Sequence, residues 1–216
     1  MRRVSRCLTS AAEMAPPLAL SDITGMILAG GRGSRMNDVD KGLQPLLGRP
    51  LVQHALERLA PQVGRVCISA NRNLEQYRAL GAPVFGDDFP GFAGPLAGIH
   101  AGLTHCSTPW LVCVPCDSPA LPMDLVARLA HAVMDADADV AIAATGEDAT
   151  VRTHPVFCLL RVALLPQLQI YLDDGGRKVS AWQGTLKSVE VHFADVDAFR
   201  NINSVAELRH FEEART

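Results

Sequence analysis

Residues 23 to 41 read ITGMILAGGRGSRMNDVDK. The stretch begins with a short apolar run, residues 23 to 28, which is typical of a buried strand in a parallel sheet. Glycines follow at positions 30, 31 and 33. Because glycine lacks a Cβ atom and tolerates positive φ, such a loop can bring backbone N–H groups close to an anion. The stretch therefore predicts a strand that leads into an anion-binding loop.

Three basic side chains lie in and after these glycines, namely Arg32, Arg35 and Lys41. They would place positive charge where the phosphates of a ligand would bind. The pattern matches neither the G-x-G-x-x-G dinucleotide fingerprint nor the Walker A loop, since no Gly-Lys-Ser/Thr closes it. Taken without other motifs, the glycines are equally compatible with a basic strand-to-helix turn.

Three motifs together resemble those of the molybdenum cofactor guanylyltransferases, within the nucleotidyltransferase superfamily. The first is L-A-G-G-x-x-x-R-M with D-K-G-L at positions 40 to 43, the second is G-P-L-A-G at 94 to 98, and the third is N-I-N-S at 201 to 204. The resemblance extends over residues 23 to 212. It implies an enzyme that transfers GMP from GTP to molybdopterin, with or without bound molybdenum, and releases pyrophosphate.

The composition is that of an enzyme domain with an aliphatic core. The chain has 216 residues, 48% of them hydrophobic and only 5% aromatic, and a formal net charge of −3. This length suits one α/β domain. The charge gives no indication of nucleic-acid binding, and no apolar run approaches the roughly 18 residues of a membrane span. Most of the six cysteines lie in or beside apolar segments, which indicates buried thiols in a reducing cytoplasm.

The pattern predicts a single three-layer α/β/α domain over residues 22 to 216, with a Rossmann-like, mostly parallel sheet and a site at the carboxyl ends of the strands. Residues 1 to 21 are expected to be a disordered extension; an upstream start codon before Met14 or an organellar transit peptide are alternatives. Strands are expected at 23–28, 63–69, 83–85, 110–116, 140–144, 156–160 and 189–193. Helices are expected at 50–59, 74–80, from 97, and at 121–134, 164–172 and 205–213.

The resemblance assigns the nucleotide to loops that follow the first strands. At position 69 this chain has serine where the family has asparagine, whereas Asn71 and Arg72 match. Asn71 is also compatible with a turn or cap that ends a strand. The nucleotide-binding residues implied are Leu28, Ala29, Gly30, Gly31, Lys41, Ser69, Asn71, Asp87, Gly94 and Asp117.

Asp117 follows the most hydrophobic predicted strand and is the expected Mg²⁺ ligand. Magnesium in such sites takes one or two carboxylates together with phosphate oxygens and water. The alternative is a turn-forming aspartate, since Asp-Ser-Pro is favourable turn chemistry. With the metal held there, Asp117, Lys41 and Arg35 are the predicted catalytic residues. Cys113 and Cys116 have the spacing of half a zinc site, but the chain contains no second pair.

The resemblance places the acceptor near the last third of the chain. It implies contacts from Arg177 or Lys178 to an anionic group, and from Asn201 and Asn203, which are two apart and so share one side of an extended segment. Ser204 is expected to begin the final helix, with Glu207 completing a capping box. His154, before a proline, is interpreted as a structural hydrogen-bonding residue and not as a general base.

The nearest alternative is another nucleotidyltransferase, either a CTP-dependent molybdopterin cytidylyltransferase or an enzyme acting on a sugar phosphate. A non-catalytic, chaperone-like nucleotide-binding protein is an alternative of another class, which Asp117 and Lys41 disfavour. Expected partners are GTP and molybdopterin or molybdenum-molybdopterin, together with a client molybdoenzyme or an insertion chaperone as a further candidate.

Overall fold

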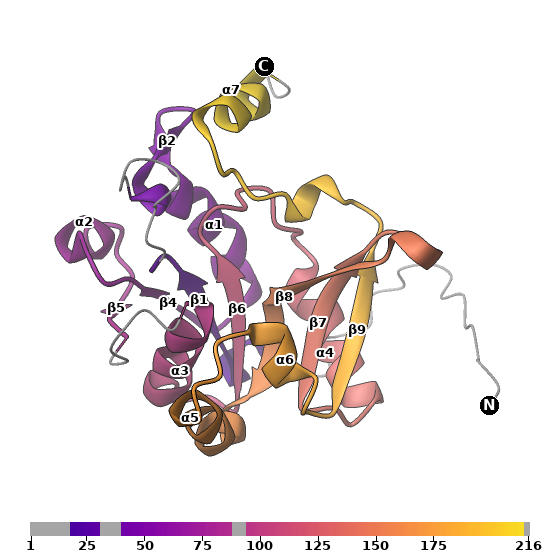
Figure 1. Cartoon of the computed structure of the whole chain (residues 1–216). Helices are drawn as coiled ribbons and strands as arrows, with labels where there is room; N and C mark the ends of the chain where they lie inside the picture. The colour runs from indigo at the N-terminus through magenta and orange to yellow at the C-terminus, as the bar shows by residue number, and fades with distance from the viewer. Residues whose placement is uncertain (1–17, 31–39, 88–93, 214–216) are drawn as a thin grey trace.

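The computed structural model describes residues 18–30, 40–87 and 94–213 (Figure 1). Within them lies a sheet of seven strands in the order β5-β4-β1-β6-β8-β7-β9 and a two-stranded hairpin, β2-β3. The strands are β1 (Ile23–Leu28), β2 (Pro45–Leu46), β3 (Arg49–Pro50), β4 (Arg65–Ser69), β5 (Val84–Phe85), β6 (Trp110–Pro115), β7 (Val140–Thr145), β8 (Arg152–Arg161) and β9 (Ser188–Phe193). The α-helices are α1 (Leu51–Leu59), α2 (Leu74–Arg78), α3 (Pro95–His105), α4 (Leu125–Asp135), α5 (Leu165–Asp173), α6 (Val179–Gln183) and α7 (Val205–Glu213).

The sheet is mostly parallel, as the sequence predicts. Strand β1 pairs in parallel with β4 and β6, β4 with β5, and β7 with β9. Only β8 runs against its two neighbours, β6 and β7. The carboxyl ends of β4, β1 and β6 therefore meet at one edge of the sheet, where open α/β folds bind ligands.

Two helical layers cover the sheet, which gives the expected three-layer arrangement. One face packs against α1 and α4, through residues such as Val52, Leu59 and Leu129. The other packs against α3, α5 and α6, including Ile99 and the fully buried Trp182. Figure 1 shows α3, α5 and α6 in front of the sheet.

The structure corrects several expected boundaries. Helix α1 begins after Pro50, because Pro50 pairs with Pro45 in the hairpin. Helix α3 begins at Pro95, a favoured first helical residue, and not at residue 97. Helix α4 begins at 125, because the Val126 N–H donates to the Gln62 side chain and not to the Pro122 carbonyl, which accepts from that same side chain.

Two strands and one α-helix of the described chain were not expected from the sequence. The two strands of the hairpin have two residues each, and α6 has five, so they are too short to show a periodic pattern. Strand β8 also begins at Arg152, four residues before the expected start, because its first residues pair with the end of β7.

Residues 18 to 21, placed in the extension from the sequence, pack on the domain. Leu18 is buried with the α1–α4 core cluster, and residues 20 to 22 form a short 3-10 helix. Gly64, just before β4, lies against this segment: a Cβ atom there would be 2.7 Å from the carbonyl oxygen of Leu20. The segment therefore covers the amino ends of β1 and β4.

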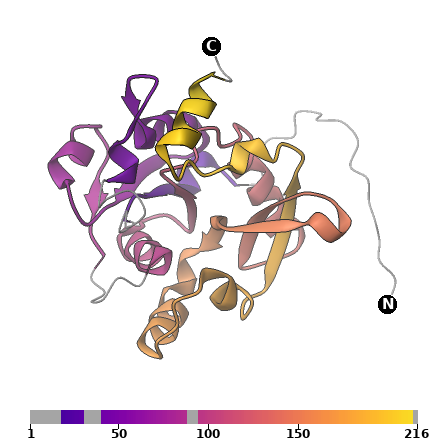
Figure 2. The same ribbon diagram turned by 45° about the horizontal axis from the view of Figure 1, so that its top comes forward.

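Helix α7 covers the β2-β3 hairpin. Leu46, Leu51 and Ile202 form a small buried cluster with Leu208 and Phe211 packed on it. Figure 2 brings this end of the molecule forward and shows the yellow helix beside the indigo hairpin.

Among the described residues, no helix combines the length and apolar character needed to span a membrane.

We expect Gly64→Ala to lower the free energy of unfolding by about 1–3 kcal/mol, because the added methyl group collides with backbone atoms that cannot rotate away. Urea unfolding followed by circular dichroism measures the change. Gly184→Ala is the control, since Gly184 has helical φ and its nearest neighbours would lie 3.4 Å from the new atom. Equal stability of both variants would show that residues 20 and 21 do not pack on Gly64.

Candidate active site

Asp117 lies two residues beyond β6 at the carboxyl edge of the sheet and is only 8% exposed. Its Oδ2 atom accepts a hydrogen bond of 2.8 Å from the Lys41 ammonium. Its backbone carbonyl accepts a further bond, 2.8 Å long, from the N–H of Ile202. The aspartate is thus held between a segment that follows β1 and one that follows β9.

The same ammonium group reaches the C-terminal segment. Lys41 Nζ donates to Asn203 Oδ1 at 2.5 Å, and Asn203 Nδ2 donates to the Asn201 carbonyl at 3.4 Å. Asn201 Oδ1 accepts a 2.8 Å bond from the hydroxyl of Ser118, the residue after Asp117. The structure therefore brings together four residues that the sequence places in one site: Lys41, Asp117, Asn201 and Asn203.

The second carboxylate oxygen of Asp117 has no hydrogen-bond partner although it is buried. A buried acceptor without a partner is costly and indicates a missing ligand or cation. No group of three or more His, Cys, Asp or Glu in the described chain could enclose a metal. A site with a single carboxylate suits Mg²⁺, which completes its shell with phosphate oxygens and water. The donor set at Asp117 therefore fits the expected ion.

Asn71 and Asp87 form a reciprocal pair at the ends of β4 and β5. Asn71 Nδ2 donates to Asp87 Oδ2 at 2.6 Å, and the Asp87 N–H donates to Asn71 Oδ1 at 2.9 Å. A Cβ atom on Gly30 would lie 3.5 Å from Asn71 Nδ2, so the end of the β1 segment borders this pair. Asn71 follows the end of a strand, as the turn interpretation expects. It also lies beside Gly30, an expected nucleotide-binding residue, so the two interpretations are compatible.

Ser69 and the G-P-L-A-G motif pack on one another beneath this pair. Ser69 is 2% exposed, and a Cβ atom on Gly98 would be 2.9 Å from its hydroxyl and 2.8 Å from Leu28 Cδ2. Gly94 is the N-cap of α3 with φ +65° and ψ −151°, a conformation essentially confined to glycine. These glycines allow α3 to approach the sheet with its N-terminus, the end that attracts anions, at the edge where the strands end.

Leu28 and Ala29 continue β1 toward the site by backbone pairing. The Ala29 N–H donates to the Ser69 carbonyl at 2.8 Å, and the Leu28 carbonyl accepts from the Cys116 N–H at 3.1 Å. Two predicted site residues, Gly31 and Arg35, lie outside the described residues, so their positions remain predictions.

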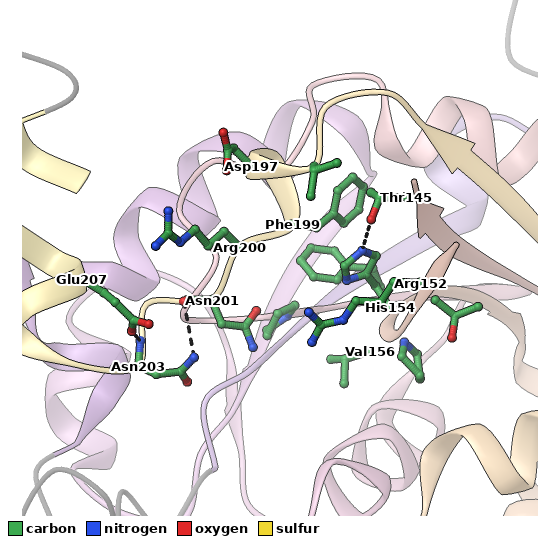
Figure 3. Close-up of a pocket in the computed structure, with 15 residues that line it drawn as sticks. Thr145, Arg152, His154, Val156, Asp197, Phe199, Arg200, Asn201, Asn203 and Glu207 are labelled. Carbon is green, nitrogen blue, oxygen red and sulfur yellow. Dashed lines mark hydrogen bonds between the residues drawn. The ribbon is translucent and has the colours of Figure 1, made fainter. Parts of the chain in front are cut away.

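A cavity of about 480 Å³ opens beside Asn201 and Asn203, toward β8 (Figure 3). Figure 3 shows Asn201, Asn203 and Glu207 on one side of it and Arg152 and His154 on the other. The lining residues are Pro115, Thr145, Arg152, Thr153, His154, Pro155, Val156, Phe157, Val196, Asp197, Phe199, Arg200, Asn201, Asn203 and Glu207.

His154 has a structural environment, in agreement with its interpretation from the sequence. Its Nε2 atom is 2.9 Å from the Thr145 hydroxyl, and its ring stacks on Phe199 with centroids 4.8 Å apart. Burial and, to a lesser extent, the charge of Arg152 lower the pKa of the imidazole. The neutral ring is therefore favoured at neutral pH.

Arg152 and Arg200 were not predicted from the sequence as site residues. Arg152 is the first residue of β8, and Arg200 directly follows a short 3-10 helix. Neither belongs to a motif, so only the folded chain shows that they line the cavity. The two predicted cations Arg177 and Lys178 do not line this cavity. The Arg177 guanidinium donates to the carbonyls of Leu172 and Gly176, at the end of α5. Their role as acceptor contacts stays a prediction.

The final helix begins as predicted, with one difference in the cap. Ser204 Oγ accepts from the Glu207 N–H at 3.2 Å, which is the expected cap. The Glu207 carboxylate accepts from the Asn203 N–H at 2.6 Å instead of the Ser204 N–H. Glu207 therefore fixes the backbone of a site residue.

Comparisons with known proteins show which family the chain is similar to. The model of the family described as MobA-like NTP transferase domain matches residues 25–189. The molybdenum cofactor guanylyltransferase of Cupriavidus necator is 56% identical over 196 residues, 90% of this chain and 98% of that protein. The protein of the same name from Bordetella petrii is 54% identical, over 88% of this chain and 96% of its own.

Solved structures share the fold at low identity. Molybdopterin-guanine dinucleotide biosynthesis protein A from Archaeoglobus fulgidus superposes with a TM-score of 0.71 at 24% identity, over 89% of this chain and 98% of its own. The 4-diphosphocytidyl-2C-methyl-D-erythritol synthase of Anaerococcus prevotii superposes with a TM-score of 0.72 at 12% identity, over 91% and 99%. The chain therefore shares its α/β fold with these two proteins.

We expect acidification to destabilise the protein in part through His154. Because its folded pKa lies below the ordinary value of 6.5, the unfolded chain binds more protons between the two values, and stability falls as pH decreases through this window. Urea midpoints measured at about pH 7.5 and about pH 5 should differ more for the wild type than for His154→Gln, which retains a donor near Thr145. The same pH dependence in both proteins would contradict the depressed pKa.

Proposed function

Because the chain belongs to the MobA-like NTP transferase family, we propose that it transfers GMP from GTP to molybdopterin or molybdenum-molybdopterin, with release of pyrophosphate. The product is the guanine dinucleotide form of the molybdenum cofactor. Identities of 56% and 54% to molybdenum cofactor guanylyltransferases, over nearly the whole length of those proteins, support this assignment. The observation that carries it is the buried Asp117 carboxylate, with one oxygen on Lys41 and the other without a partner.

We assign the nucleotide to the edge formed by β1, β4 and α3. The triphosphate would lie along the backbone that follows β1 and near Lys41, and the base near the Asn71–Asp87 pair. The N-terminus of α3, opened by Gly94, faces the same edge and favours an anion. The residues proposed to contact the nucleotide are Leu28, Ala29, Gly30, Gly31, Lys41, Ser69, Asn71, Asp87, Gly94 and Asp117.

Asp117 is the residue proposed to hold Mg²⁺, through the oxygen that has no protein partner. The bound ion would neutralise charge on the phosphates. Lys41 lies 2.8 Å from the other oxygen, so its charge is fixed beside the same phosphates. Lys41 and Arg35 are proposed to stabilise the negative charge that develops on the leaving pyrophosphate.

The acceptor is proposed to enter the cavity beside Asn201 and Asn203. A terminal phosphate of the acceptor is already an anion, so its attack on the α-phosphorus in line with the leaving group needs no strong general base. This agrees with a neutral, structurally bound His154. Arg152 and Arg200 in the cavity, and Arg177 or Lys178 from the segment after α5, are the proposed cations for the acceptor.

The proposal also concerns the setting of the reaction. An enzyme with several buried, unpaired thiols suits a reducing cytoplasm, where we place it. Its product would pass to a molybdoenzyme client, either directly or through an insertion chaperone.

We expect Asp117→Ala to lower the rate of pyrophosphate release by at least about 100-fold, because it removes the proposed metal ligand. The fold should persist, which circular dichroism and thermal unfolding would show. Asp135→Ala, at an exposed position of α4, is the control and should keep wild-type turnover. Full activity of Asp117→Ala would refute the metal assignment.

We expect calorimetric titration with Mg²⁺ and without acceptor to show that GTP binds at least about tenfold more tightly than CTP, ATP or UTP, a difference of about 1.4 kcal/mol. A preference for CTP would keep the fold and the proposed mechanism but make the chain a cytidylyltransferase. No binding of any nucleotide would refute the proposed function itself.

A further inference from the structure

Tyr77 is a fully buried tyrosine whose hydroxyl donates to Asp40 Oδ1 at 2.6 Å. It belongs to α2, which leads to β5 at the end of the sheet, whereas the cavity is lined by residues of β8. Burial raises the pKa of this hydroxyl far above its ordinary value, so it remains a donor at any working pH. Asp40 is itself only 8% exposed and directly precedes Lys41.

The other oxygen of Asp40 is bound as well. Asn73 Nδ2 donates to Asp40 Oδ2 at 2.9 Å. Asp40 and Asn73 are N-cap residues, of the types that usually bond to their own helix, yet neither side chain does so here. Both use their polar atoms to join the segment around Lys41 to α2.

Gly42 makes the contact on the other side of Lys41. A Cβ atom at this position would lie 2.5 Å from the Tyr77 hydroxyl and 3.3 Å from Cys116 Sγ. Asp40 and Gly42, the two neighbours of Lys41 in the sequence, therefore both contact Tyr77. Gly42 also lies against Cys116, the residue before Asp117. The motif D-K-G has a tertiary explanation: an aspartate that accepts from Tyr77, and a glycine that leaves room for it.

We propose that Tyr77 is a positioning residue, which through Asp40 and Gly42 holds the Lys41 ammonium between Asp117 and Asn203. Lys41 is 26% exposed at its side chain and sits in a three-residue 3-10 turn, so its own segment constrains it little. Without the hydroxyl, Asp40 Oδ1 is left buried and unpaired, and the turn can relax toward solvent. The kinetic part of this inference rests on the proposed function.

The first test is the kinetics of Tyr77→Phe, which removes only the hydroxyl. We expect kcat to fall about 10- to 100-fold, because a displaced charge stabilises the transition state less. KM for GTP should rise by a smaller factor than kcat falls, since the contacts proposed for the base remain and only the Lys41 contact to the triphosphate is disturbed. Glu75→Gln, on the exposed side of the same helix, is the control and should retain wild-type kcat. Wild-type kcat in Tyr77→Phe would overturn the proposal.

The second test asks whether Tyr77 acts through Lys41. In a Lys41→Met background, measured by long incubation with radiolabelled GTP, Tyr77→Phe should cost less than about a further twofold, because the group it positions is absent. A merely structural tyrosine would lower activity by the same factor in both backgrounds, which would overturn the inference. Asn73→Gly, which keeps the left-handed backbone at φ 53° but removes the amide, should act in the same direction and serves if Tyr77→Phe is poorly folded.

A third measurement needs no substrate. The chain has three lysines, Lys41, Lys178 and Lys187, so the side-chain ammonium signals of ¹⁵N-lysine protein can be assigned by single substitutions. The Lys41 signal should shift toward those of the exposed lysines in Tyr77→Phe and stay in place in Glu75→Gln. An unchanged Lys41 signal would refute the positioning role. If the wild-type protein turned over no nucleotide, the proposed function would be refuted. The Lys41 signal in Tyr77→Phe would then decide by itself whether Tyr77 positions Lys41.

Discussion

The ion pair between Lys41 and Asp117 joins two segments that are 76 residues apart, at the point where the central strand β6 ends. Removing one member of a buried pair leaves an uncompensated charge, so the two residues constrain each other. Asn203 adds a third segment, 162 residues from Lys41. The site thus depends on a single ammonium group that joins three parts of the chain: its own segment after β1, the residues after β6 and the segment after β9.

The position of Asp117 in the sheet agrees with the proposal that two substrates meet there. On one side β6 pairs in parallel with β1, whose continuation and whose neighbour β4 border the edge proposed for the nucleotide. On its other side β6 pairs with the antiparallel β8, which leads to the cavity lined by Arg152 and His154. The strand order reverses at β1, since β4 lies on one side of it and β6 on the other, and Asp117 thus follows a strand at the switch point, where open α/β sheets bind ligands.

Several residues around the site satisfy tertiary contacts in place of local ones. Asp40 and Asn73 leave their own helices uncapped and bond to each other, and Glu207 bonds to Asn203 and not to the residue that it would ordinarily cap. Asp117 keeps one buried oxygen without a partner. Local rules that fail together around one site are a sign that the site has other constraints, and the binding of charged ligands that we propose here is such a constraint.

The sequence alone determined the fold class and the order of the main strands and helices, because apolar periodicity is encoded over a few neighbouring residues. The grouping of Lys41, Asp117, Asn201 and Asn203 came from motifs that resemble those of a known family. Only the tertiary structure decided that β8 runs antiparallel, that residues 20 and 21 lie against Gly64, and that Arg152 and Arg200 reach the cavity. It also gave Asp40 and Gly42 their common partner, Tyr77. Such contacts join residues distant in sequence, and no local pattern encodes which distant side chain will fill the space beside a given backbone atom.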